Sequence, residues 1–199
     1  MTAINRDKEA EAILGNLVRA LHMLEDCAEF TALIPEVRTN IAYALPDAQT
    51  PEAVAAFPGR ITVRCGHPYA VDVPNWGASD HLARRIIESR KYDKHVNAII
   101  NFKFEEKILT VVQEYCQREG LLFGWLDRSA EPVETAKYDG TSMTWKVEQL
   151  FTKYGAMPHI YYEGPGWGKE PLFLAQGKNA VEVVSMAIQI AHRYSGYHP

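Results

Sequence analysis

The chain has 199 residues, a length that predicts one larger domain with a sizeable core, over residues 1–199. Its net charge of -4 argues against nucleic acid as a partner, and no apolar run approaches the roughly 20 residues of a membrane span. The polar N-terminus lacks a signal-peptide pattern, and three well separated cysteines without a CxxC pair indicate the reducing cytoplasm.

The first half of the chain predicts helices alternating with strands. Apolar residues at helical spacing predict an amphipathic helix over about residues 6–27. The run ending in NIAYAL predicts a strand, TPEAVAAF a short helix with Thr50 as N-cap, and PGRITVRC a turn followed by a strand. VPNWGAS predicts a loop, and Ser79 is the expected N-cap of a helix over DHLARRIIESRKY.

The second half repeats the alternation. VNAIIN, LLFGWL, HIYYE and PLFLAQ predict strands, while EEKILTVVQEYCQRE and AVEVVSMAIQIAHRY predict helices. The segment DRSAEPVETAKYDG is polar and irregular, and Ser142 is the expected N-cap of a helix over MTWKVEQLFTKY. Strands alternating with helices predict an α/β sandwich with helices on both faces of a central sheet.

The nine-residue segment EGPGWGKEP connects two expected strands and contains three glycines. It is not a Walker A loop, because Glu-Pro and a strand follow the lysine. Gly166 and Gly168 could bring backbone N–H groups close to a phosphate, with Lys169 supplying charge and Glu170 beside it. The alternative is a glycine-rich strand connection with a solvated lysine. The length of the loop favours function.

The segment NWGASDHLARR predicts a second anion site. Gly77 and Ser79 precede the expected helix, whose free N–H groups and positive dipole end would face an anion. His81 lies in its first turn, and Arg84 follows about one turn later. The alternative is an ordinary cap with surface cations.

Other cations also occur at expected strand ends. Arg60 lies in PGRI, and Asp127 and Arg128 follow LLFGWL; the alternatives are a surface arginine and a local ion pair. Loops at strand ends of an open α/β sheet tend to converge on one pocket. The seven histidines show no ligand spacing, so we expect no metal site. Without a recognisable nucleophile motif, the cations and glycines favour electrostatic stabilisation of a leaving phosphate.

The motifs TNIAYALP, PGRI, GASDHLAR, NAIINFKF, DRSAEP and GKEP follow one another in the order typical of one family. Together they resemble the ThiN-type thiamine-phosphate synthase domain over nearly the whole chain. The resemblance implies a three-layer αβα sandwich with a central mixed sheet, similar to the class II aldolase-like fold. The histidine-held metal of those aldolases has no counterpart in this sequence. Asn40 in TNIAYALP and Asn101 in NFK join the expected substrate-binding residues.

The resemblance also implies a reaction between hydroxymethylpyrimidine pyrophosphate and hydroxyethyl-methylthiazole phosphate, giving thiamine monophosphate and pyrophosphate. Arg60 and His81 are then the expected catalytic pair. The partners are small phosphorylated pyrimidine and thiazole substrates. No organic cofactor is expected, and Mg²⁺ would arrive bound to the pyrophosphate. A homodimer is the base-rate expectation for the oligomeric state.

The same resemblance offers a second hypothesis, a non-catalytic thiamine-phosphate sensor that acts through a partner protein. His81 favours the enzyme, as does the short segment ahead of TNIAYALP, which leaves no room for a DNA-binding domain. Arg38, Trp76 and Trp167 depart from the smaller residues expected at these places, and each could reshape the pocket.

Overall fold

The strands of the computed structural model, which describes residues 3–136, 139–165 and 170–196, form one large sheet and one hairpin. The strands of the large sheet are β1 (Ile41–Ala44), β2 (Val54–Ala56), β5 (Asn75–Trp76), β6 (Ala98–Lys103), β7 (Phe123–Leu126), β8 (Ile160–Glu163) and β9 (Leu172–Gly177). Their spatial order is β5-β2-β1-β6-β9-β8-β7. Neighbours pair antiparallel except β7 and β8, which run parallel. The sheet is therefore mixed.

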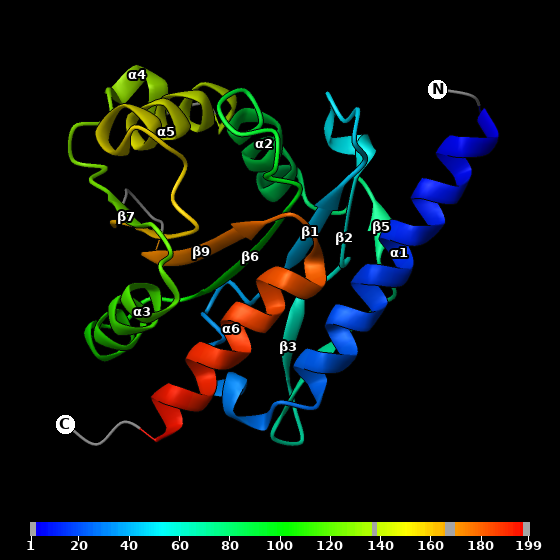
Figure 1. Cartoon of the computed structure of the whole chain (residues 1–199), viewed down its shortest axis with the longest axis horizontal. Coiled ribbons are helices and arrows are strands. Elements are labelled where there is room, and N and C mark those ends of the chain that lie inside the picture. The colour runs from blue at the N-terminus through cyan, green and yellow to red at the C-terminus, as the bar shows by residue number, and fades with distance from the viewer. Residues whose placement is uncertain (1–2, 137–138, 166–169, 197–199) are drawn as a thin grey trace.

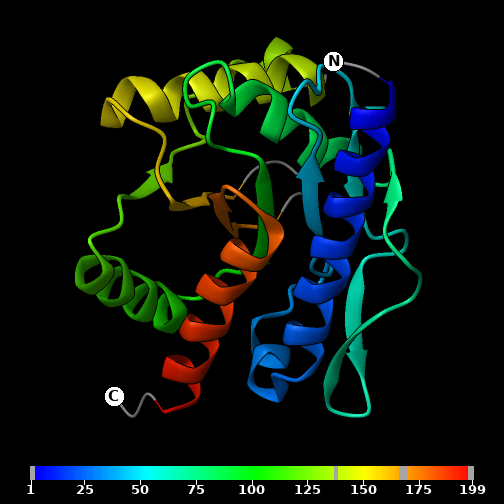
Figure 2. The same ribbon diagram turned by 45° about the vertical axis from the view of Figure 1, so that its right-hand side comes forward.

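Helices cover both faces of this sheet (Figure 1). The longer helices are α1 (Ala3–Glu25), α2 (Asp80–Ser89), α3 (Glu106–Glu119), α5 (Asp139–Tyr154) and α6 (Ala180–Ser195). On one face α6 crosses the central strands, with α1 packed along one side of it and α3 along the other (Figure 2). On the opposite face α2 packs against β1 and β6, and α5 packs against α2 and β7. This arrangement confirms the expected α/β sandwich with a central mixed sheet.

A separate hairpin of β3 (Ile61–Arg64) and β4 (His67–Ala70) lies beside α1 and a 3-10 helix, η1 (Ala28–Leu33). Its turn is tight, because Arg64 pairs directly with His67. The two turn residues, Cys65 and Gly66, have φ angles of 52° and 80°. Positive φ at both positions gives the turn the twist that an antiparallel hairpin needs. The first of these strands is the one expected in PGRITVRC, and the second was not expected.

Several predicted element boundaries are wrong. TPEAVAAF forms only a 3-10 turn, η2 (Pro51–Ala53), and then strand β2, because the fully buried residues after Ala53 pair with β1. The segment expected to be irregular contains a short helix, α4 (Val133–Ala136). Ser142 does not cap α5, which begins at Asp139 and includes Ser142 in its first turn. Thr50 and Ser79 do occupy N-cap positions, but neither side chain makes a capping hydrogen bond.

The helix and strand patterns place apolar side chains between the layers. Leu17 and Leu24 of α1, and Val183, Ala187 and Ile190 of α6, are fully buried. Their helical spacing is the pattern that an amphipathic helix uses to cover a sheet. Among the described residues, no helix combines the length and the apolar character that crossing a bilayer requires.

Candidate active site

A cavity of about 290 Å³ opens on the face of the sheet that α2 covers. It contains six of the residues that the sequence analysis assigned to the site: Asn40, Arg60, Ser79, His81, Asn101 and Glu170. The other lining residues are Val37, Leu82, Glu163, Leu172 and Leu174. Segments far apart in the sequence therefore meet here, as the argument from strand ends predicted.

The floor of the cavity comes from three neighbouring strands. Asn101 of β6 lies opposite Leu174 of β9, and Leu172 lies opposite Glu163 of β8. Side chains opposite one another in paired strands point to the same face of the sheet. The floor is thus largely apolar, with one amide and one carboxylate.

One wall of the cavity is the N-terminal end of α2. Ser79 is the N-cap residue, and its side chain makes no capping hydrogen bond within the protein. His81 is half-buried in the first turn, next to the buried Leu82. The first N–H groups of a helix have no intrahelical acceptor and carry its positive dipole end. This wall combines an imidazole, a hydroxyl and N–H donors, which together suit an anion.

The opposite side of the cavity is formed by two loops that hydrogen-bond to each other, one carrying Arg38 and the other Arg60. Both arginines have positive φ angles, 68° and 66°. Each guanidinium donates to the other loop: Arg38 Nη1 to the Gly59 carbonyl at 3.2 Å, and Arg60 Nη1 to the Val37 carbonyl. A left-handed conformation in a residue other than glycine costs about 1–3 kcal/mol, and such residues cluster at functional sites. Arg60 is held in this conformation at the edge of the cavity, with its side chain exposed.

Asn40 and Asn101 hold these loops in place. The Asn40 side chain bonds to Phe57 in both directions, accepting from its N–H at 3.0 Å and donating to its carbonyl at 3.1 Å. Asn101 Oδ1 accepts from the Asn40 N–H at 2.8 Å, and Asn101 Nδ2 donates to the Arg38 carbonyl at 3.0 Å. Both amides line the cavity, but these bonds make them braces for the loop that carries Arg60.

Replacing Asn40 by alanine is therefore expected to reduce stability. The substitution leaves the buried N–H of Phe57 without its side-chain partner, while the Phe57 carbonyl keeps only the Arg60 N–H. An unsatisfied buried polar group costs about 1–3 kcal/mol, so we expect a loss of about 2–3 kcal/mol in urea denaturation. Asn75→Ala is the control, because Asn75 is exposed and its side chain accepts from the adjacent Trp76 N–H. Equal stability of the two variants would contradict the bracing role.

Glu163 connects the cavity to a buried group of charges that the sequence analysis missed. Its carboxylate pairs with Arg85 of α2 and, at 3.0 Å, with Lys146 of α5. The side chains of Arg85 and Lys146 are 0% and 1% exposed. Burial lowers the pKa of Arg85, because the charged guanidinium loses its hydration. A carboxylate between two buried cations offsets that cost.

The structure has a second buried ion pair. Arg128 donates to Glu131 through Nε and Nη2, at 3.0 and 2.9 Å. Burial opposes ionisation of Glu131, but hydrogen bonds from Ser142 and Arg128 outweigh it and lower its pKa. The alternative of a local ion pair holds for Arg128, but its partner is Glu131 and not Asp127. Asp127 is exposed and accepts from the Ser129 N–H at 2.8 Å.

Four further expected site residues lie outside the cavity lining: Gly77, Arg84, Asp127 and Arg128. Gly77 has a φ angle of 70°, which a turn before α2 requires, and the Arg84 guanidinium pairs with Asp80 at 2.8 Å.

Four residues of the glycine-rich loop lie outside the described residues: Gly166, Trp167, Gly168 and Lys169. At the end of their loop, Glu170 Oε1 accepts from the Val37 N–H at 2.7 Å, which joins this loop to the arginine-bearing loops. Trp76 is part of β5 and does not line the cavity.

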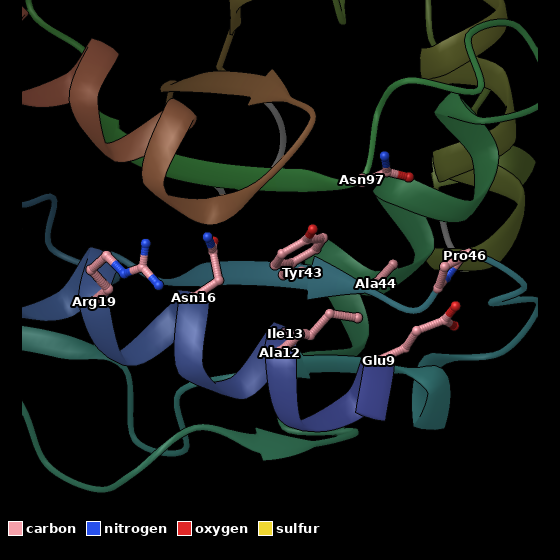
Figure 3. Close-up of a pocket in the computed structure, with 9 residues that line it drawn as sticks. All are labelled: Glu9, Ala12, Ile13, Asn16, Arg19, Tyr43, Ala44, Pro46 and Asn97. Atoms are coloured by element: carbon pink, nitrogen blue, oxygen red, sulfur yellow. The ribbon is translucent and has the colours of Figure 1, made fainter. Parts of the chain in front are cut away.

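A larger hollow, of about 440 Å³, lies between α1 and β1 (Figure 3). Figure 3 shows Asn16 and Arg19 on α1 and Tyr43 on β1 beside it. The hollow contains none of the expected site residues. The first turn of α6 lies beside it, but the Val181 N–H there already donates to Asn16 Oδ1 at 3.2 Å. The cavity beside α2 is the better candidate for phosphorylated substrates, because it combines a helix N-terminus with Arg60 and His81.

Comparison with known proteins gives consistent matches. The family described as thiamine-phosphate synthase ThiN matches residues 16–189. The thiamine-phosphate synthase ThiN of Methanothermobacter thermautotrophicus is 38% identical over 181 residues, which cover 91% of this chain and 93% of the relative. The bifunctional thiamine biosynthesis protein ThiDN of Methanocaldococcus jannaschii is 32% identical, over 98% of this chain but 43% of its own length. Among solved structures, the C-terminal domain of a phosphomethylpyrimidine kinase aligns with a TM-score of 0.86 at 31% identity, over 92% of this chain and 100% of that domain.

Proposed function

The chain belongs to the ThiN thiamine-phosphate synthase family, and from that membership we propose the reaction that it catalyses. It joins hydroxymethylpyrimidine pyrophosphate to hydroxyethyl-methylthiazole phosphate and releases thiamine monophosphate and pyrophosphate. The observation that carries this proposal is that Arg60, from a loop, and His81, from the first turn of α2, line one cavity with an apolar floor. Both groups suit the recognition of phosphate.

The lining of the cavity matches the two parts of such substrates. Leu82, Leu172 and Leu174 offer apolar surface on which a heteroaromatic ring can pack. Arg60, His81 and the first N–H groups of α2 offer donors to phosphate oxygens. An uncharged ring substrate would leave these donors without a ligand partner.

The chemistry requires orientation and charge stabilisation more than a nucleophilic residue. The thiazole nitrogen attacks the methylene carbon of the pyrimidine with its lone pair, forming a C–N bond. The C–O bond to pyrophosphate breaks, and the leaving oxygen takes the electron pair. No proton has to leave the thiazole nitrogen, so no general base is needed. The protein has to hold both substrates in line and stabilise the negative charge that develops on the leaving group.

Arg60 and His81 are proposed to stabilise the leaving pyrophosphate. The Arg60 guanidinium can bind phosphate oxygens through two N–H groups. The dipole of α2 disfavours a positive charge on His81 when the site is empty, and bound pyrophosphate reverses that preference. The imidazolium then donates to the departing oxygen at the step in which the negative charge develops.

Mg²⁺ is proposed to enter as part of the substrate, bound to its pyrophosphate. Two carboxylates line the cavity among the described residues. Glu163 already pairs with Arg85 and Lys146, whereas Glu170 uses Oε1 to accept from the Val37 N–H and has a second oxygen. Of these two carboxylates, Glu170 is therefore the one that would contact the metal. The metal would further neutralise the charge of the phosphate.

The proposal is tested by incubating the protein with both substrates and quantifying thiamine monophosphate and pyrophosphate. Equimolar formation of the two products, dependent on both substrates and on the protein, is the expected result. The contrasting result is tight binding of thiamine monophosphate without its formation, at several Mg²⁺ concentrations. That outcome would replace the transferase with the non-catalytic sensor.

A further inference from the structure

We propose that Cys27, Glu29 and His192 form a Zn²⁺ site that joins the start of η1 to the last turn of α6. The three side chains are the one group of this kind among the described residues whose ligand atoms all lie within 4.8 Å of one another. None of them lines the candidate active site. The proposal is therefore independent of the proposed reaction.

The distances between the three ligand atoms match those around a tetrahedral zinc ion. Cys27 Sγ lies 3.5 Å from His192 Nε2 and 3.6 Å from Glu29 Oε2, and the last two atoms are 3.8 Å apart. Zinc bonds of about 2.3 Å to sulfur and about 2.0–2.1 Å to nitrogen or oxygen, at tetrahedral angles, place the sulfur about 3.6 Å from the other two atoms. The same geometry places nitrogen and oxygen about 3.4 Å apart. A small side-chain movement would bring all three onto one ion.

The ligand types and their exposure also suit zinc. Thiolate and imidazole ligands favour zinc and similar transition metals over Mg²⁺ or Ca²⁺. Cys27 is 4% exposed, whereas the side chains of His192 and Glu29 are 51% and 44% exposed. The sulfur thus lies at the bottom of the group, with the other two ligands towards solvent. An ion can enter from the solvent side, and water can complete its coordination.

The fold explains why spacing along the chain does not show this site. Cys27 precedes η1 directly, and His192 lies in the last turn of α6, which packs against η1. The two residues are 165 positions apart. The expectation of no metal site rested on histidine spacing, which detects only ligands close together in the sequence.

The competing interpretation is a hydrogen-bonded group without metal. In that case the Cys27 thiol donates to the Glu29 carboxylate, and His192 lies against both. Burial raises the pKa of Cys27, so without a metal its thiol stays protonated and unreactive. The two interpretations differ in one respect: a metal site requires that all three side chains bind the same added ion.

The test is a titration of metal-free, tag-free protein with Co²⁺, followed by Zn²⁺. We expect thiolate-to-cobalt charge-transfer absorption and strong tetrahedral d–d bands that saturate at one equivalent and vanish when Zn²⁺ displaces cobalt. Cys27→Ser should abolish the charge-transfer band, and His192→Ala should weaken binding by at least about tenfold. Zn²⁺ at about a hundredfold excess over its dissociation constant should raise the Tm by about 5–10 °C in the parent but not in Cys27→Ser.

Two cysteine variants serve as matched controls. Cys116 is buried, burial raises its pKa to about 12, and no group of this kind surrounds it in the part of the chain that the structure describes. Cys65 is exposed. Cys116→Ser and Cys65→Ser should retain the cobalt spectrum of the parent. Absence of the spectrum from the parent, or its persistence in Cys27→Ser, would overturn the proposal in favour of the hydrogen-bonded group.

Discussion

Alanine in place of Arg60 or His81 is expected to lower turnover at saturating substrate by roughly a hundred- to thousandfold. Both side chains line the same cavity and would act on the oxygen that leaves with pyrophosphate. Because this charge develops mainly in the transition state, kcat should fall far more than the KM values change. The measurement is thiamine monophosphate formation under steady-state conditions, after thermal melts have shown that each variant is folded.

The chain offers a matched control for each substitution. Arg64 ends strand β3, which begins directly after Arg60. Its guanidinium lies over the Tyr69 ring and does not line the cavity. His95 is exposed and also lies outside the cavity. Arg64→Ala and His95→Ala should keep turnover within a few-fold of the parent. If Arg60→Ala and His81→Ala behave like these controls, the two residues serve only the structure.

Glu163→Gln is expected to lower the free energy of unfolding by about 3–5 kcal/mol. The substitution keeps the volume of the side chain but removes the charge between Arg85 and Lys146. Arg85 already lacks hydrogen-bond partners for Nε and Nη1 among the described residues. Breaking a buried ion pair leaves an uncompensated charge in a region of low dielectric, which is the source of the large effect. Urea denaturation at neutral pH measures the loss.

A surface ion pair provides the comparison. Glu88 of α2 pairs at 2.7 Å with Lys91, just past the end of the helix, and the two side chains are 16% and 56% exposed. Exposed pairs of this kind contribute about 0–1 kcal/mol, so Glu88→Gln should change stability by less than about 1 kcal/mol. An equally small effect for Glu163→Gln would show that the buried charges are not coupled in the way their contacts indicate.

The sequence predicted the architecture well where burial is continuous. The residues of β6 up to Phe102 are all buried, and β9 is buried from Phe173 to Gln176, so both strands appear as apolar runs. Strand β2 was mistaken for a helix because Pro51 and alanines favour a helical start, whereas its strand conformation depends on pairing with β1. That pairing is a tertiary interaction, which local propensity does not contain.

The site was predicted in part, for a related reason. Arg60 lies in a short loop, and Ser79 and His81 lie at the start of a helix; such element ends can be recognised along the chain. Glu163 could not be recognised in this way, because its role depends on Arg85 and Lys146 from two different helices. Asn40 and Asn101 do line the candidate cavity, but the sequence did not show that their amides brace the backbone.

The central claim is that the cavity beside α2 binds the phosphorylated substrates, and a crystal structure with thiamine monophosphate and pyrophosphate tests it most directly. Phosphate oxygens are expected within hydrogen-bond distance of the Arg60 guanidinium and of His81 or the first N–H groups of α2. A heteroaromatic ring is also expected to pack on the apolar floor formed by β9. Ligand in the larger hollow between α1 and β1, beside Arg19 and Tyr43, with the cavity beside α2 vacant, would contradict the account.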